Sequence, residues 1–498
     1  MGEAAKNKEA ASKDFTFQKI KLLFLCLVVK NKSCMATKKD FTTERSVRSR
    51  AQRAGNQRFV LIGGFLGAGK TTAIGALVRW LQAQGMTPGV ITNDQGDGLI
   101  DTALGQSHTA HVREVTGGCF CCRAADLGIA LRSMTEGGAG GSASGVHKSR
   151  AVAVRGGAAD QIVLGQGVDD QGGTADRPDV FIAEPVGSCT DLVATVILPI
   201  EKIYGNPLEL APMSVVIDAA RVEAAMKDER ANNPGGKRSG FTADVRYIFA
   251  KQLEEAELLV LNKSDLLTGK RLVKLIAWLQ AKYPGKRVLT VSSTTGAGLD
   301  TWFALLLAEQ SQPKALMDID YGRYGAGEER MGWYNASLGL HSTGRALDGN
   351  RVLMALAKDI QAELEAAGAE IAHFKMSLGR RTEGSSNYKA LAAEQNRGDA
   401  RLEDFAVVNV VRNGVAATLS RRSADKFIAA ELLVNLRAEA GPEVLELAVA
   451  KHLNKTRKEW HTIWKHCAAF KPGQPQPTYR VTSLLNKTRS ETPPLKKH

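Results

Sequence analysis

The chain has 498 residues, of which 44% are hydrophobic and 24% carry a charge. This length suits about two to four domains, and these fractions exclude a wholly disordered, collagen-like or disulfide-stapled chain. The net charge of +14 would suit an acidic partner, but residues 1–57 contribute +8 of it and residues 451–498 contribute +9. The body between them is therefore close to neutral, and we do not expect a nucleic-acid partner.

Residues 1–57 are mostly polar and basic, which predicts a disordered N-terminal extension. The apolar run at residues 22–29 is far shorter than the ~20 residues that a membrane-spanning helix needs. No small-residue cleavage site follows it, so a secretory signal is not expected either. We expect a cytoplasmic protein without a membrane partner, with residues 1–34 either part of the extension or a misassigned start.

Short apolar strands alternate with helical patterns between residues 58 and 312. Strands are predicted at residues 58–64, 90–92, 180–183, 214–217, 258–261 and 288–291, and an amphipathic helix at residues 71–84. Such alternation predicts an α/β domain with a mostly parallel sheet flanked by helices. A Gly-rich stretch at about residues 134–178 interrupts the pattern and is predicted to be an insertion.

A linker over residues 313–330 is expected to lead into a smaller α+β C-terminal domain over residues 331–485. A helix is predicted over residues 351–366, and a hairpin turning at Asn413-Gly414. Residues 486–498 are expected to form a disordered tail.

Two further C-terminal segments carry a periodic pattern. Apolar residues alternate between Ala372 and Leu378, which predicts a strand with His373 and Lys375 on its other face. Ser423 is predicted to cap a helix that stops at Gly441. We interpret three nearby residues as ordinary helix residues rather than as a second metal site: His461, His466 and Cys467.

The segment Gly64-Phe-Leu-Gly-Ala-Gly-Lys-Thr71 has the spacing of a phosphate-binding loop. Its glycines let backbone N–H groups approach phosphate oxygens, and the following helix adds its N-terminal dipole. Lys70 would contact the β- and γ-phosphates, and Thr71 would offer a hydroxyl to Mg²⁺. The expected phosphate-binding residues, in a P-loop NTPase fold, are Gly64, Gly67, Ala68, Gly69, Lys70, Thr71 and Thr72.

The segment Asn262-Lys263-Ser264-Asp265 follows an apolar strand. The carboxylate of Asp265 can accept two hydrogen bonds from guanine N1–H and N2–H₂, a pair of donors that adenine lacks. Ser293 follows the next strand, where a base-supporting loop is expected. Asn262, Lys263, Asp265 and Ser293 therefore predict GTP rather than ATP as the ligand. A nucleotide kinase is a weaker alternative, because kinases do not need this motif.

Glu184 and Gly187 also follow an apolar strand. A carboxylate at such a strand end can bind Mg²⁺ through water or orient the attacking water, and a glycine N–H three residues on can reach the γ-phosphate. Together with Lys70, these two are the expected catalytic residues of a GTPase.

Three of the seven cysteines lie within four positions, at Cys119, Cys121 and Cys122. Seven are too few for a secreted disulfide scaffold, so the cluster indicates a metal or redox site in a reducing compartment. Thiolates suit Zn²⁺ and Cu(I), and a tetrahedral site needs a fourth ligand. Free cysteines also pack as small buried hydrophobes, so the spacing alone leaves both interpretations open.

These motifs, in this order, resemble the CobW-type family of G-protein metallochaperones over residues 58–312. The segments that carry the resemblance are GGFLGAGKTT, ITNDQGDGLID, GGCFCC, FIAEPVG, VVIDA and QLEEAELLVLNKSDL. The resemblance implies a GTPase that carries a metal, commonly Zn²⁺ or Co²⁺, to a client protein. It also implies that the three clustered cysteines bind that metal and that Glu184 and Gly187 belong to a γ-phosphate-sensing switch.

A second switch is implied at residues 93–101, with Asp94 and Asp97 as candidate Mg²⁺ or metal-shell groups. The family usually has Asn-Glu where this chain has Asn93-Asp94, and Thr or Ser where it has Pro185, which leaves the switch geometry open. We expect a GTP-hydrolysing metallochaperone that delivers zinc or cobalt to an unidentified metalloprotein, with a nucleotide-dependent homodimer as a further expectation. The alternative is a regulatory or assembly GTPase with structural cysteines that acts on a protein or RNA.

Overall fold

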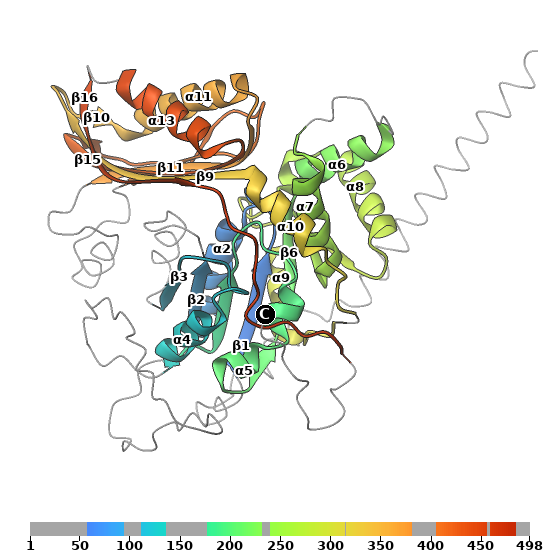
Figure 1. The fold of residues 1–498 in the computed structure, drawn as a ribbon. Coiled ribbons are helices and arrows are strands. Elements are labelled where there is room, and N and C mark those ends of the chain that lie inside the picture. The colour runs from blue at the N-terminus through green and yellow to red at the C-terminus, as the bar shows by residue number, and fades with distance from the viewer. Residues whose placement is uncertain are drawn as a thin grey trace, which may run out of the picture. The chain divides into compact units, whose positions relative to one another are not determined.

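The computed structural model (Figure 1) describes most of the chain from Gln57 onward. The described ranges are residues 57–93, 111–135, 177–231, 240–313, 315–380, 405–455 and 459–484. The expected N-terminal extension, Gly-rich insertion and C-terminal tail lie outside these ranges, apart from a few boundary residues, and so do Asp94, Asp97 and the rest of the expected switch after Asn93.

The first part of the described chain is a parallel sheet with helices packed against it, as the sequence predicts (Figure 1). Its strand order is β3-β2-β4-β1-β6-β7-β8, and β5 pairs with the start of β1. The strands are β1 (Gln57–Gly63), β2 (Pro88–Asn93), β3 (Val112–Val115), β4 (Val180–Glu184), β5 (Leu208–Leu210), β6 (Ser214–Asp218), β7 (Leu258–Asn262) and β8 (Arg287–Thr290). Of these, β3 and β5 were not expected from the sequence.

Helices follow most of these strands. They are α2 (Lys70–Ala83), α4 (Ala124–Thr135), α5 (Ile200–Tyr204), α6 (Ala219–Ala231), α7 (Ala243–Glu255), α8 (Gly269–Lys282) and α9 (Leu299–Ala308), with a π-helical turn η2 (Val193–Ile197) and a 3-10 turn η3 (Ser264–Leu266). Because all strand pairings among the described strands of this sheet are parallel, the loops after β1, β2, β4 and β7 meet at one edge,.

The central strands of the sheet are buried on both faces, which explains why β1, β4, β6 and β7 are apolar runs rather than alternating patterns,. In β1, Phe59 and Leu61 pack into one core cluster and Val60 and Ile62 into another. Successive strand side chains point to opposite faces, so each strand contributes to both layers. The second cluster includes α2 and α9, and the first includes α4 to α8.

The second part is a six-stranded antiparallel sheet of order β13-β12-β11-β15-β9-β16. Its strands are β9 (Met331–Ser342), β11 (Glu370–Arg380), β12 (Phe405–Val410), β13 (Thr418–Arg421), β15 (Ala429–Glu439) and β16 (Trp460–Phe470), and β10 (Leu347–Asp348) pairs with β14 (Lys426–Phe427) beside it. Helices α11 (Gly349–Ala366) and α13 (Pro442–Lys455) share a core with this sheet. The predicted helix over residues 351–366 and the hairpin at Asn413-Gly414 are confirmed.

The predicted helix from Ser423 to Gly441 is wrong, because this segment contains β14 and β15. Its Ala, Glu and Leu residues suit a helix, but β15 lies between β9 and β11 and pairs with both. Leu432, Val434 and Leu436 enter the core with the alternation of a strand. Tertiary pairing therefore overrides the local helix propensity.

The helix predicted around His461, His466 and Cys467 is also wrong, since all three lie on β16. Cys467 Sγ lies 3.9 Å from Glu446 Oε1. Within the described ranges these residues do not form a group of potential metal ligands. No described helix has the length and apolarity that crossing a membrane would require.

The stretch expected to be a linker contains helix α10 (Tyr321–Arg330), which packs against α7. Its Glu328 is buried, and Ser188 Oγ donates a hydrogen bond to Glu328 Oε2 at 3.1 Å. Burial raises the pKa of Glu328 to about 8. The folded protein therefore holds a proton on this carboxyl that the unfolded chain, with an ordinary glutamate pKa, releases near pH 4.5,.

The variant Glu328→Gln tests whether the buried Glu328 carboxyl is protonated in the folded protein, through the pH dependence of stability. Because the folded-state pKa is raised, the wild-type free energy of unfolding should fall as pH rises from about 4.5 to 8, by about 1.4 kcal/mol per unit of pKa difference at most,. The variant should lose this part of the pH dependence and be the more stable form above pH 8. Urea unfolding at several pH values measures it, and parallel profiles for the two proteins would contradict the assignment.

Candidate functional site

The phosphate loop joins β1 to α2 and has a backbone that only glycine accommodates at two points. Gly64 has φ +133°, and a Cβ there would lie 2.2 Å from the Val216 carbonyl oxygen. Gly69 has φ +94°, and its Cβ would lie 2.5 Å from Asn262 Nδ2. The Lys70 ammonium donates to the Gly64 carbonyl at 2.9 Å. The loop thus curls over Lys70, as the motif predicts.

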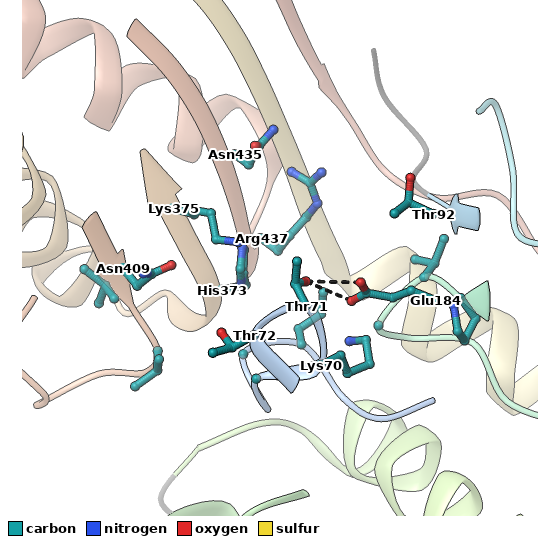
Figure 2. Close-up of a pocket in the computed structure, with 18 of the residues that line it drawn as sticks. Lys70, Thr71, Thr72, Thr92, Glu184, His373, Lys375, Asn409, Asn435 and Arg437 are labelled. Carbon is teal, nitrogen blue, oxygen red and sulfur yellow. Dashed lines mark hydrogen bonds between the residues drawn. The ribbon is translucent and has the colours of Figure 1, made fainter. Parts of the chain in front are cut away.

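The end of β4 brings Glu184 to the start of α2. Thr71 Oγ1 donates to Glu184 Oε1 at 3.0 Å and lies 3.2 Å from Oε2, as Figure 2 shows. β4 pairs with β1, so these two residues meet although they are far apart in sequence. Their hydroxyl and carboxylate oxygens are ligands that suit Mg²⁺, so the residues present fit the expected magnesium site.

The segment after β7 is tied to the phosphate loop. Asn262 Nδ2 donates to the Ala68 carbonyl at 2.8 Å, and the Ser293 N–H and hydroxyl reach Asn262 Oδ1 at 2.9 and 3.0 Å. Lys263 Nζ lies 2.8 Å from the Gly67 carbonyl and 2.7 Å from Asp218 Oδ2. This network orders the loop in which a base would sit.

Asp265 lies exposed on η3, next to that network. Lys263 before it has a left-handed φ of 59°, which turns the chain sharply after β7. An exposed carboxylate beside an ordered loop can accept the two guanine hydrogen bonds that the motif predicts.

Gly187 is packed against the phosphate loop. A Cβ on it would lie 2.6 Å from Leu66 Cδ2, and Gln252 Nε2 donates to the Gly187 and Cys189 carbonyls at 3.0 and 2.8 Å. The segment after β4 is therefore fixed from both sides. This close approach gives a physical reason for the glycine.

A cavity of about 240 Å³ lies over the phosphate loop (Figure 2). Predicted residues that line it are Gly67, Gly69, Lys70, Thr71, Thr72, Glu184, Gly187 and Lys263. Predicted residues outside its lining are Gly64, Ala68, Asn262, Asp265 and Ser293. Its opposite wall comes from the C-terminal sheet and includes Trp333, His373, Lys375, Asn409, Asn435 and Arg437. The phosphate-loop motifs do not predict this second wall.

The three clustered cysteines converge in the loop between β3 and α4. Their sulfur atoms all lie within 4.8 Å of one another, and Cys119 Sγ lies 3.2 Å from Cys122 Sγ. Cys119 and Cys121 are buried, and Cys122 is partly exposed. No other group of three or more potential ligands occurs among the described residues. The arrangement fits a thiophilic cation such as Zn²⁺.

Asn93 at the end of β2 holds this cysteine loop. Its Nδ2 lies 2.8 Å from the Val115 carbonyl and 2.7 Å from the Gly118 carbonyl, and its Oδ1 accepts from the Phe120 N–H at 2.9 Å. Asn93 also lines the cavity over the phosphate loop. One side chain therefore connects the two candidate sites.

The sequence did not point to Cys189, which is buried two residues after Gly187. Burial and a hydrogen bond with Cys119 raise the pKa of the Cys189 thiol well above its ordinary value. Its thiol thus belongs to the same cluster of sulfurs, although no spacing rule links it to the other three. Its place directly after the Glu184–Gly187 segment is the signal that could have found it.

A segment near the C-terminal end also reaches the cysteine loop. The Gln476 N–H donates to Cys122 Sγ at 3.2 Å, and Thr478 donates to the carbonyls of Cys121 and Cys122 at 2.8 and 3.0 Å. Arg480 Nε pairs with Asp191 Oδ2 at 2.7 Å. Sequence patterns could not predict these contacts, because more than 350 residues separate Gln476 from Cys122.

The match to one family model agrees with the motifs. Residues 58–290 match the family model for the CobW/HypB/UreG nucleotide-binding domain. No curated protein matches the chain. Among solved structures, the chain is similar to Zn(II)-bound YjiA GTPase from E. coli, at 14% identity and a TM-score of 0.30, over 80% of this chain and 99% of that one.

It is also similar to two HypB structures. Hydrogenase maturation factor HypB from Archaeoglobus fulgidus is 15% identical over 52% of this chain and 92% of that one, with a TM-score of 0.29. HypB from Helicobacter pylori in complex with nickel is 14% identical over 51% of this chain and 86% of that one, with a TM-score of 0.30. Residues 58–290 thus match the model of the CobW/HypB/UreG nucleotide-binding domain and have the phosphate-loop geometry that such a domain requires.

Proposed function

We propose that this protein binds and hydrolyses GTP with Mg²⁺ and uses the nucleotide state to take up a transition metal and release it to a client protein. The metal is held by Cys119, Cys121 and Cys122, with Zn²⁺ the first candidate and Co²⁺ the second. The observation that carries the proposal is the position of Asn93, which lines the phosphate-loop cavity and holds the cysteine loop.

The nucleotide chemistry follows from residues of the phosphate loop and strand ends. Lys70 is positioned at the loop to neutralise the β- and γ-phosphate oxygens, and Asp265 to read guanine. Thr71 and Glu184 would hold Mg²⁺, which when bound would offset developing charge on the phosphates. The Gly187 N–H is proposed to contact the γ-phosphate, and Glu184 to orient the attacking water.

The thiol chemistry favours a cation. Hydrogen-bond contacts with Cys121 and Cys122 hold the pKa of Cys119 well below its ordinary value, whereas the contact with Cys119 raises the pKa of Cys122 to about 11. The thiols of this cluster therefore differ in how readily they lose a proton. A divalent cation would displace the remaining protons and replace these shared hydrogen bonds with metal–sulfur bonds, so its affinity should fall at low pH.

The alternative is a regulatory or assembly GTPase whose cysteines only fill the core. Its supporting observation is burial, since Cys119 and Cys121 are 6% and 1% exposed and pack with Phe120 in the core. The partner in that case would be a protein or an RNA. The client, the metal and a nucleotide-dependent homodimer are predictions in either case.

Cys121→Ser tests the metal site. Removing one of three thiolates should weaken Zn²⁺ affinity at least about tenfold, because a remaining two-thiolate site loses a full metal–sulfur bond. Zn²⁺ competition with a chromophoric chelator measures it in the full-length protein. Cys467→Ser is the matched control, because Cys467 is exposed on β16 and should not change affinity. Equal affinities for Cys121→Ser and wild type would support the structural role instead.

Asp265→Asn tests the base assignment. The amide can accept only one of the two guanine hydrogen bonds, so GTP affinity should fall by about tenfold or more while ATP affinity stays low. Asp300→Asn, on the exposed start of α9, is the control. Fluorescence titration with labelled GTP and ATP measures both variants. Retention of full GTP selectivity by Asp265→Asn would refute the assignment.

A further inference from the structure

The C-terminal sheet turns a polar face toward the phosphate loop. On β11, Phe374, Met376 and Leu378 enter the core under α11 and α13, so His373 and Lys375 project from the other face, as the sequence predicts,. Both residues line the cavity over the phosphate loop (Figure 2). The face away from the helices is therefore polar at His373 and Lys375, and its apolar cluster of Val407 and Leu433 lies in the row beyond Lys375.

Strand register gathers polar side chains around Lys375. Lys375 pairs directly with Asn409 on β12 and with Asn435 on β15, and both amides line the cavity. Two residues earlier on β11, His373 pairs with Arg437 of β15. Directly opposed strand residues lie within contact distance of one another, so these groups form a continuous polar surface.

The Arg437 guanidinium is held in place within this surface. It is 1% exposed, lies 4.0 Å from the Trp333 ring centre, and donates to Asn335 Oδ1 at 2.7 Å. Lys375 is 7% exposed. Both cations are therefore part of the cavity wall rather than of the open surface.

The described lining of the cavity holds more cations than carboxylates. Among the described residues that line it, the cations are Lys70, Lys263, Lys375 and Arg437 and the carboxylate is Glu184, while Lys263 pairs with Asp218 behind the lining. Lys375 and Arg437 of the C-terminal sheet contribute two of these four cations. The Trp333 indole N–H, on the same lining, is buried without a hydrogen-bond partner among the described residues. An anion with several acceptor oxygens matches this set of donors.

The two walls are in direct contact beside the cavity. A Cβ on Gly67 of the phosphate loop would lie 3.0 Å from the Ala372 carbonyl, next to His373. Arg221 of α6 donates to the Ala372 and Val411 carbonyls at 2.9 and 3.0 Å. The polar face of the sheet is therefore fixed over the phosphate loop.

We propose that this face is a phosphate sensor, in which Lys375 and Arg437 contact the terminal phosphate of a bound nucleoside triphosphate. The C-terminal domain would then distinguish GTP from GDP, because the diphosphate lacks the group that these cations contact. This inference rests on the proposed binding of GTP. It assigns the C-terminal sheet a role in the nucleotide site that the nucleotide-binding motifs do not include.

The test is the affinity of full-length protein for GDP and for GTPγS, a triphosphate that resists hydrolysis, measured by isothermal titration calorimetry. Lys375→Met removes the charge and keeps an unbranched side chain. It should weaken GTPγS binding at least about tenfold, the typical loss of one charge-assisted hydrogen bond, and GDP binding less than about twofold. Lys375→Arg should recover most of the loss. Lys358→Met, exposed on α11, is the matched control and should bind both nucleotides like wild type.

If Lys375→Met binds GTPγS as tightly as wild type does, or loses equal affinity for GTPγS and GDP, the proposed phosphate sensor is wrong. If wild type binds neither guanine nucleotide, the proposed function fails as well, so the two failures can be told apart. A second measurement needs no variant. Hydrogen exchange of β11 and β15 amides in wild type should be slower with GTPγS than with GDP, and identical exchange in the two states also overturns the proposal.

Discussion

The connection between the cysteine loop and the phosphate-loop cavity depends on the hydrogen bonds of one buried side-chain amide, that of Asn93. Asn93 ends β2, where its side chain holds both sides of the cysteine loop through the Val115 and Gly118 carbonyls and the Phe120 N–H. The same residue lines the cavity over the phosphate loop. Since the strands are parallel, β2 places Asn93 at the edge where nucleotide loops meet,. A shift of this strand end would alter the cavity and the thiols together.

Two further contacts link the phosphate loop to the thiol cluster through the end of β4. Glu184 bonds to Thr71 at the start of the phosphate-loop helix, and the segment that follows Glu184 leads through Gly187 to Cys189 beside the thiol cluster. The proposed nucleotide site and the thiol cluster thus share two strand ends, those of β2 and β4. Coupling between two sites requires an element that both ligands bias, and in the proposed function these two strand ends are that element.

The sequence predicted the parts of the site that depend on local spacing. The phosphate loop and the Asn262–Asp265 segment were predicted because a strand, a turn and a helix form from neighbouring residues. Cys189, Gln476 and the polar face around Lys375 depend on long-range packing, which one sequence does not encode as spacing. The helix predicted from Ser423 failed for the same reason, since pairing with β9 and β11 decides that segment.

The measurement that tests the account most directly is Zn²⁺ affinity of the full-length protein in the presence of GTPγS and of GDP, for wild type and Asn93→Ala. The account predicts that the wild-type affinity differs between the two nucleotides by at least about fivefold, a typical coupling between sites. It also predicts that Asn93→Ala still binds both ligands but loses most of this difference. Equal wild-type affinities with the two nucleotides, or a difference that survives in Asn93→Ala, would contradict it.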